Sequence, residues 1–278
     1  MTSDAVAAVM MLASGAIHAV VNALVKSGND KLASRALLDG SSAVFVLPAL
    51  PFVALPTGAW HWMIASLVVH VAYLAFLVQA LSRADMTVAY PVLRGIAPAL
   101  TAALSVTVFG EPIGPAVAAG VALVSTGVVL VGMRRDVDPH GLGWAIATGI
   151  TIAVYTVLDA HGVRAAPSAA GYIAWFFVFC GFGIGGMFAL WRGTAFLVAA
   201  RTQWKPGAIA GALSIVTYGL ALGAYRIGDT TRLAALRECS ILVALALGVY
   251  VLKERVDRNR ALGAVLVAAG AAVLIAAG

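Results

Sequence analysis

The feature that most constrains this chain is a series of ten apolar segments, each 18 to 27 residues long, joined by short loops. A helix rises about 1.5 Å per residue, so roughly 20 apolar residues cross the hydrocarbon core of a bilayer. The sequence therefore predicts an all-α membrane protein with ten transmembrane helices. The segments are residues 5–25, 36–55, 62–82, 86–109, 112–133, 141–158, 165–191, 206–225, 233–252 and 261–278.

Composition excludes a soluble enzyme or a nucleic-acid-binding domain. Hydrophobic residues make up 62% of the chain and charged residues 11%, which leaves too little polar surface to cover a water-soluble globule. The formal charge of +6 comes from basic residues scattered over the loops, without the clustered, aromatic-interleaved pattern typical of nucleic-acid binding. We expect the lipid bilayer as the surroundings and no nucleic acid as a partner.

Residues 90–132 recur near the C-terminus, which indicates an internal duplication. A second, fainter correspondence at an offset of 134 relates Ala13-Ser14-Gly15 to Ala147-Thr148-Gly149. The chain is thus predicted to consist of two five-helix repeats, residues 1–135 and 136–278. The main correspondence, at an offset of 143, relates Leu93-Arg94 to Leu236-Arg237, Glu111 to Glu254, Gly120 to Gly263 and Gly127 to Gly270.

Five helices per repeat is an odd number, so the second repeat must enter the membrane from the opposite side to the first. Two inverted repeats surrounding a central site are the architecture of alternating-access transporters. Arg94 lies about two helical turns into its segment and Arg237 about one turn into its own, which brings both arginines toward mid-membrane from opposite faces.

Polar side chains recur on one face of several apolar segments and predict a wet cavity. Ser14, His18, Asn22 and Lys26 follow one another at a spacing of four, and Ser66, His70 and Tyr73 share a face of the third segment. A histidine hydrogen-bonded within a dry core is the competing interpretation for His18. The predicted substrate-binding residues are His18, Asn22, His70, Tyr73, Arg94, Tyr155, Tyr218, Arg237 and Glu238.

Arg94, Arg237 and Glu238 are expected to form the charged centre of this site. An arginine near mid-bilayer costs from about 2.5 kcal/mol upward, so each needs a partner or water. We expect Glu238 to pair with Arg94 across the interface of the repeats, with a substrate carboxylate or phosphonate competing for the arginine. A permanent structural ion pair is the alternative. Pro98, four residues after Arg94, is expected to kink its helix.

Other marked residues have structural interpretations. Asp39 is expected to complement a helix N-terminus and to pair with Arg35, and Glu111 to cap the start of the fifth helix. The glycines of the fifth and tenth segments predict close helix packing, with a dimer face as the alternative, so the oligomeric state is a monomer or a homodimer. The linker over residues 192–206 is polar enough to lie in the membrane interface.

The pattern resembles the drug/metabolite transporter superfamily, specifically its EamA-like ten-helix members, over nearly the whole chain. The resemblance rests on Gly110-Glu111, Lys253-Glu254 and the glycines that follow each of them. The tryptophan-glycine pair found in the first helix of many repeats is replaced by Ser14-Gly15 and Thr148-Gly149, so the subfamily and the substrate are left open. The resemblance implies a secondary exporter of amino acids or related solutes, with protons as a candidate coupling ion, in a bacterial inner membrane.

Catalytic and nucleotide-binding motifs are absent from the sequence. There is no GxxxxGK[ST] loop, which argues against ATP as the direct energy source, and no HExxH helix or nucleophile elbow. We expect a transporter without a cofactor or a metal rather than an enzyme. The alternative from another class is an intramembrane enzyme or permease acting on phosphonate-like compounds or lipid headgroups.

The distribution of basic residues predicts the orientation. Thirteen Lys and Arg residues lie in loops after odd-numbered segments and three after even-numbered ones, which places the odd-numbered loops in the cytoplasm and both termini outside. The family resemblance favours the opposite orientation.

The charge count predicts that a phosphatase fused to the C-terminus is active in the periplasm of whole cells. An inactive but well-expressed fusion would contradict the charge count.

Overall fold

The computed structural model describes residues 2–27, 31–83, 86–132, 139–250 and 257–278, and within these ranges it contains helices and no strand. In chain order the elements are α1 (Ser3–Ser27), α2 (Lys31–Val46), η1 (Leu47–Phe52), α3 (Trp60–Arg83), α4 (Met86–Thr107), α5 (Pro115–Gly132), α6 (Pro139–Ala165), α7 (Ala169–Cys180), η2 (Gly181–Gly185), α8 (Gly186–Arg192), α9 (Thr194–Ile227), α10 (Thr230–Arg237), α11 (Ser240–Tyr250) and α12 (Arg258–Ala276).

Eight helical segments of the described chain are long and apolar enough to cross a membrane. They correspond to the first, third to eighth and tenth predicted segments. The second segment is shorter because α2 passes into the 3₁₀-helix η1 at Pro48 and Pro51, where proline cannot donate the next backbone hydrogen bond. The ninth is divided at Glu238 and Cys239 into α10 and α11. The kink expected at Pro98 does not interrupt α4, which continues through it.

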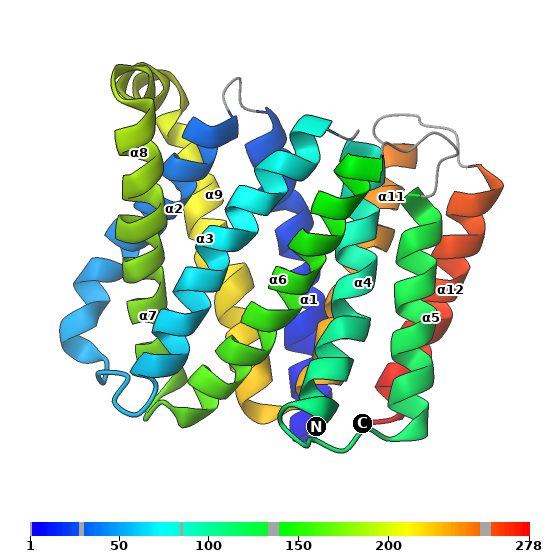
Figure 1. Ribbon diagram of the computed structural model, residues 1–278. Coiled ribbons are helices and arrows are strands. Elements are labelled where there is room, and N and C mark those ends of the chain that lie inside the picture. Colours follow the sequence, from blue (N-terminus) through cyan, green and yellow to red (C-terminus); the bar gives the residue numbers. More distant parts are fainter. Residues whose placement is uncertain (1, 28–30, 84–85, 133–138, 251–256) are drawn as a thin grey trace.

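The helices form a bundle in which the two chain ends lie together at one end (Figure 1). At the opposite end α1 finishes and α2 begins (Figure 1). Helices from the N-terminal half pack mainly on helices from the C-terminal half: α3 and α4 on α6, α1 and α2 on α9, and α5 on α12. The two halves of the chain are therefore interleaved and share one interior.

The glycines of α5 and α12 form a close seam within the chain. A Cβ atom on Gly127 would lie 2.7 Å from the carbonyl oxygen of Gly263, and one on Gly270 would lie 2.9 Å from that of Gly120. Backbones this close are possible only between glycines, and small residues allow helices to associate in lipid through packing alone. The predicted packing seam is confirmed, and these glycines are covered by the same chain.

Glu111 does not cap a helix, so that prediction is wrong. α5 begins at Pro115, and Glu111 lies in the preceding loop, which turns at Gly110 with φ of +65°. Its carboxylate instead contacts Arg164 Nη1 at 3.3 Å and His161 Nε2 at 3.7 Å. The corresponding Lys253-Glu254 lies outside the described residues.

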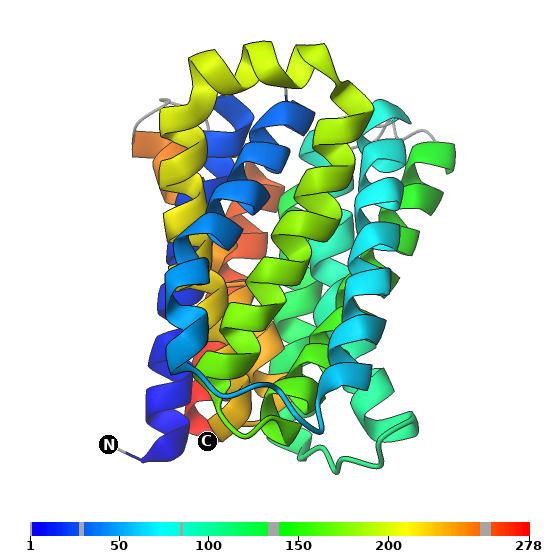
Figure 2. The same ribbon diagram turned by 90° about the vertical axis from the view of Figure 1, so that its left-hand side faces the viewer.

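The start of α9 runs across the end of the bundle that is remote from the chain termini, nearly perpendicular to the long helices (Figure 2). It follows α8 after a turn at Gly193, and Pro206 lies inside α9. Leu197, Val198 and Trp204 are exposed along this stretch. This placement agrees with the prediction of an interfacial linker, because apolar and basic side chains together suit the headgroup region.

The seam makes a specific prediction about stability. Gly127→Ala would place a methyl group 2.7 Å from a backbone oxygen and 2.8 Å from Val267 Cγ2. We expect it to lower the free energy of unfolding by about 1–3 kcal/mol, as overpacking does, although alanine favours a helix by up to about 1 kcal/mol. Thermal unfolding in detergent measures the change.

Gly143→Ala is the matched control, because that glycine lies in α6 with nothing within 4 Å of its Cβ position. It should leave the unfolding temperature unchanged or raise it. Equal unfolding temperatures for the two variants would show that α5 and α12 are not in close contact.

Candidate functional site

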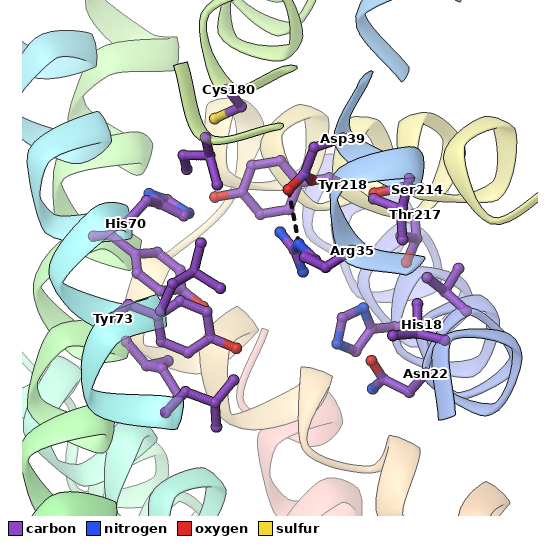
Figure 3. Close-up of a pocket in the computed structure, with 18 of the residues that line it drawn as sticks. His18, Asn22, Arg35, Asp39, His70, Tyr73, Cys180, Ser214, Thr217 and Tyr218 are labelled. Carbon is purple, nitrogen blue, oxygen red and sulfur yellow. Dashed lines mark hydrogen bonds and ion pairs between the residues drawn. The ribbon is translucent and has the colours of Figure 1, made fainter. Parts of the chain in front are cut away.

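A cavity of about 250 Å³ lies among helices from both halves of the chain. His18 and Asn22 project from α1 on one side, and His70 and Tyr73 from α3 on the other, with the side chain of Arg35 from α2 between them (Figure 3). The residues of α1 that line it come from the last half of that helix, and those of α4 from its first half. The cavity therefore lies toward the end of the bundle that is remote from the chain termini.

Eight of the nine predicted site residues line this cavity. The polar faces recognised on separate helices converge because those helices pack around one space. Glu238 does not line it, and lies buried behind Arg94. The eight are His18, Asn22, His70, Tyr73, Arg94, Tyr155, Tyr218 and Arg237.

Aromatic rings form one wall. His70 stacks on Tyr155 with ring centroids 4.1 Å apart, and Phe176 stacks on Tyr218 at 5.2 Å. Tyr73 meets Tyr155 edge-on at 5.7 Å. The His70 ring is also fixed by its own helix, since Nδ1 lies 2.9 Å from the carbonyl oxygen of Ser66. This wall is rigid and offers hydroxyl groups as well as ring faces.

Arg94 forms the predicted ion pair with Glu238. The distance from Arg94 Nε to Glu238 Oε2 is 2.8 Å, and Arg94 Nη2 donates to Ser240 Oγ at 3.2 Å. Both partners of Arg94 lie at the break between α10 and α11. The pair thus joins α4 of the first half to the interrupted helix of the second half.

Arg237 has a different environment from Arg94. Its side chain is on the cavity wall, with Cζ 5.5 Å from the centre of the Tyr218 ring, a cation–π geometry. Its Nε atom is buried without a hydrogen-bond partner. Among the described residues no carboxylate lies within ion-pair distance of this guanidinium.

Sequence reasoning missed the role of Arg35 and Asp39. The predicted pair exists, with Arg35 Nε 2.9 Å from Asp39 Oδ2, but both residues line the cavity (Figure 3). The prediction that Asp39 complements a helix N-terminus is wrong, because α2 begins at Lys31 and Asp39 lies about two turns inside it. The spacing of four gave the pairing, but it could not show which way that face of α2 points.

Tyr90 is a second missed residue. Its hydroxyl accepts a hydrogen bond from Asn22 Nδ2 at 2.8 Å, and both residues line the cavity. Ser14, from the same predicted stripe as Asn22, instead packs in the interior, where its hydroxyl donates to the carbonyl of Thr217 at 2.6 Å. The side chain of Lys26 lies outside the described residues.

A network around Arg164 closes the bundle at the end with the chain termini. Arg164 donates to the carbonyl oxygens of Tyr225 at 2.8 Å and Gly228 at 2.7 Å, and to Thr230 Oγ1 at 2.8 Å. It also donates to Glu111 at 3.3 Å. One guanidinium therefore ties the loop after α4 to the turn between α9 and α10.

The cavity is equipped for binding. It presents hydroxyl groups, imidazoles, aromatic faces and charges of both signs. The described residues contain no group of three or more His, Cys, Asp or Glu side chains placed to share a metal ion. The free thiol of Cys180 faces the cavity.

Comparisons with known proteins agree with the fold. Residues 139–276 match the EamA-like transporter family, and residues 52–124 match the Small Multidrug Resistance protein family. Among 29 matching chains of solved structures, one crystal structure of a protein covers 98% of this chain and 96% of its own, with 20% identity and a TM-score of 0.75. No curated protein matches the sequence significantly.

The buried ion pair predicts non-additive effects on stability. Arg94→Gln and Glu238→Gln should each lower the free energy of unfolding by about 3–5 kcal/mol, because each leaves one buried charge unpaired. The double variant should lose much less than the sum of the two. Thermal unfolding in detergent tests this, with exposed Arg83→Gln as the control; additive losses would mean that the two charges do not interact.

Proposed function

Because the chain belongs to the EamA-like transporter family of the drug/metabolite transporter superfamily, we propose that it is a secondary transporter of a small polar or zwitterionic metabolite such as an amino acid. The observation that carries the proposal is Arg237, a guanidinium on the cavity wall with no carboxylate partner in the described chain. An arginine retains its charge in proteins, and a charge in a membrane interior requires compensation. A substrate carboxylate provides it.

Asp39 gives the cavity lining a group that suits a positive charge. Asp39 lines the cavity with only 6% of its side chain exposed, whereas its partner Arg35 is 35% exposed. Arg35 can therefore turn toward water while Asp39 faces a bound ammonium group. Tyrosine hydroxyls from Tyr73 and Tyr90 add hydrogen-bonding capacity to the lining. A zwitterion with one carboxylate and one amine would satisfy both Arg237 and Asp39.

The size of the cavity agrees with a small solute. A volume of 250 Å³ equals that of about eight water molecules at about 30 Å³ each. This suits a solute with on the order of ten non-hydrogen atoms.

We assign the alternating-access movement of transport to two inverted repeats, residues 1–135 and 136–278, which would move relative to each other. Related glycines approach related helix positions to within one residue: a Cβ on Gly15 would lie 2.9 Å from the carbonyl of Arg237, and one on Gly149 would lie 3.0 Å from that of Leu93, the residue before Arg94. The pairs Gly15/Gly149 and Leu93-Arg94/Leu236-Arg237 are those that the repeat relates. Such reciprocal contacts support a two-fold axis in the membrane plane and alternating access around it.

The cavity lies toward the end where α1 finishes and α2 begins, the end to which the positive-inside rule assigns the cytoplasm. At the other end Arg164, Arg226 and Arg232 are engaged by protein acceptors, so they add little free positive charge there. In this conformation we therefore place the site on the cytoplasmic side of a bacterial inner membrane.

Counterflow in proteoliposomes tests the proposal. Purified protein is reconstituted with an unlabelled solute inside, and uptake of the labelled solute is followed for a panel of amino acids, nucleosides, phosphonates and cationic drugs. We expect stimulated uptake of at least one amino acid, recovered chemically unchanged. Arg237→Gln should lower it about ten- to a hundredfold, the effect of losing a hydrogen bond to a charged group of about 1.5–3 kcal/mol.

Arg83→Gln is the control, since Arg83 is exposed at the end of α3 and lies outside the cavity lining. It should exchange solute as well as the unmodified protein. Exchange of cationic drugs alone would contradict the anion-binding role of Arg237, and a chemically altered solute would favour the enzymatic alternative.

A further inference from the structure

A carboxylate outside the cavity lining has no role in the binding scheme so far. Asp159 on α6 is fully buried, and its two oxygens accept hydrogen bonds from two tyrosines. Tyr172 on α7 donates to Oδ1 at 3.2 Å, and Tyr218 on α9 donates to Oδ2. Ser66 on α3 is a further hydrogen-bonding partner of this carboxylate, and like the two tyrosines it is a neutral group.

Asp159 differs from the other buried carboxylates in its charge balance. Glu238 is paired with Arg94 and Asp39 with Arg35, and the partly exposed Glu111 is paired with Arg164. Within the described ranges no basic side chain lies within ion-pair distance of Asp159. Ionising a carboxylate in a low-dielectric interior costs free energy when no cation lies nearby. Binding a proton makes the group neutral and removes that cost.

Tyr218 connects Asp159 to the solute cavity. Its hydroxyl donates to the carboxylate, its ring lines the cavity, and the guanidinium of Arg237 lies over that ring. These two charged groups, neither of which has an ion-pair partner among the described residues, are thus separated by a single tyrosine. They balance each other when the cavity is empty and Asp159 is ionised.

Each helix packed on α6 contributes polar groups near this carboxylate. Besides Tyr172 and Tyr218, these groups are Ser66 and His70 from α3 and Tyr225 from α9. Cys180, the last residue of α7, is a further one. On α4 and α10 the charged groups are Arg94, already paired, and Arg237. On α6 itself Tyr155 lies one turn before Asp159, and His161, which faces Glu111, lies two residues after it.

We propose that Asp159 is a proton-binding site that couples solute transport to the proton gradient through Tyr218. The inference rests on the proposed transport function. When the carboxylate of a solute occupies Arg237, the positive charge that balances Asp159 is cancelled, and Asp159 takes up one proton from water to become a neutral acid. The solute carboxylate and the proton then cross together, and Asp159 releases the proton as the solute leaves. Because linkage is reciprocal, acid conditions also strengthen binding of the carboxylate.

The coupling is tested in proteoliposomes with a labelled amino acid from the counterflow panel. Two assays are run on each protein: exchange without a pH gradient, and accumulation driven by an imposed gradient that is acid outside. The unmodified protein should do both. Asp159→Asn, which keeps the size of the side chain and one acceptor oxygen but binds no proton, should retain exchange within about twofold but lose gradient-driven accumulation. Asp159→Glu should recover part of the accumulation.

Asp4→Asn is the matched carboxylate control. Asp4 contacts Arg232 at 3.4 Å, and its side chain is 45% exposed at the other end of the bundle, so this variant should keep both activities. Accumulation by Asp159→Asn at the rate of the unmodified protein would overturn the proposal. So would loss of exchange together with accumulation, since Asp159 would then serve binding or folding rather than coupling.

A measurement without solute separates failure of this inference from failure of the transport proposal. Infrared difference spectra of the purified protein between acidic and alkaline buffer should show a carboxylic acid band that is absent from Asp159→Asn and present in Asp4→Asn. Identical spectra for the unmodified protein and Asp159→Asn would show that Asp159 exchanges no proton, whatever the protein transports.

Discussion

The need to compensate buried charge is the constraint on which the interior of this protein depends. The ion pair between Arg94 and Glu238, 2.8 Å long, illustrates it: neither residue is tolerable alone in hydrocarbon, so α4 must lie against the break between α10 and α11. The close packing of Gly15 on the carbonyl of Arg237 brings α1 to the same place. Four helices or helix ends are thereby fixed around one electrostatic requirement.

The need to compensate buried charge also explains why Arg94 and Arg237, which the repeat relates, have different surroundings. The repeat makes Arg94 and Arg237 equivalent in sequence, but Glu238 follows Arg237 directly and points to Arg94. Adjacent residues on a helix are about 100 degrees apart, so Glu238 cannot easily serve its neighbour. In the structure Arg94 is tied to the framework by its ion pair, whereas Arg237 is available at the cavity wall.

Much of the site could be predicted from the sequence because helical periodicity is local. Polar residues at a spacing of four, such as His18 and Asn22, must share a face, and a polar face in an apolar helix has to meet something polar. Periodicity does not give the rotation of a helix about its axis in the bundle. Asp39 and Arg35 were therefore paired correctly but assigned to the wrong surroundings, and the apolar cavity residues Leu77 and Ile152 carry no signal at all.

Helix ends and breaks were the least predictable parts of the fold. Pro98 lies within α4, which remains continuous, whereas the ninth segment breaks at Glu238 and Cys239, where no proline or glycine occurs. Hydrogen bonds to the third preceding residue, such as Glu238 N to Ala235 O at 3.1 Å, keep the backbone paired through the break. Its position depends on the side chains of α4 and α1, which lie far away in sequence.

The network around Arg164 opposes any opening of the bundle at the end where the chain termini lie. Four hydrogen bonds link this guanidinium to the loop after α4 and to the turn after α9, each with a net value of about 0.5–1.5 kcal/mol in ordinary surroundings. Opening that end would break several of them at once, before water could replace them. A step that separated these elements would therefore have a high activation enthalpy and would slow steeply on cooling.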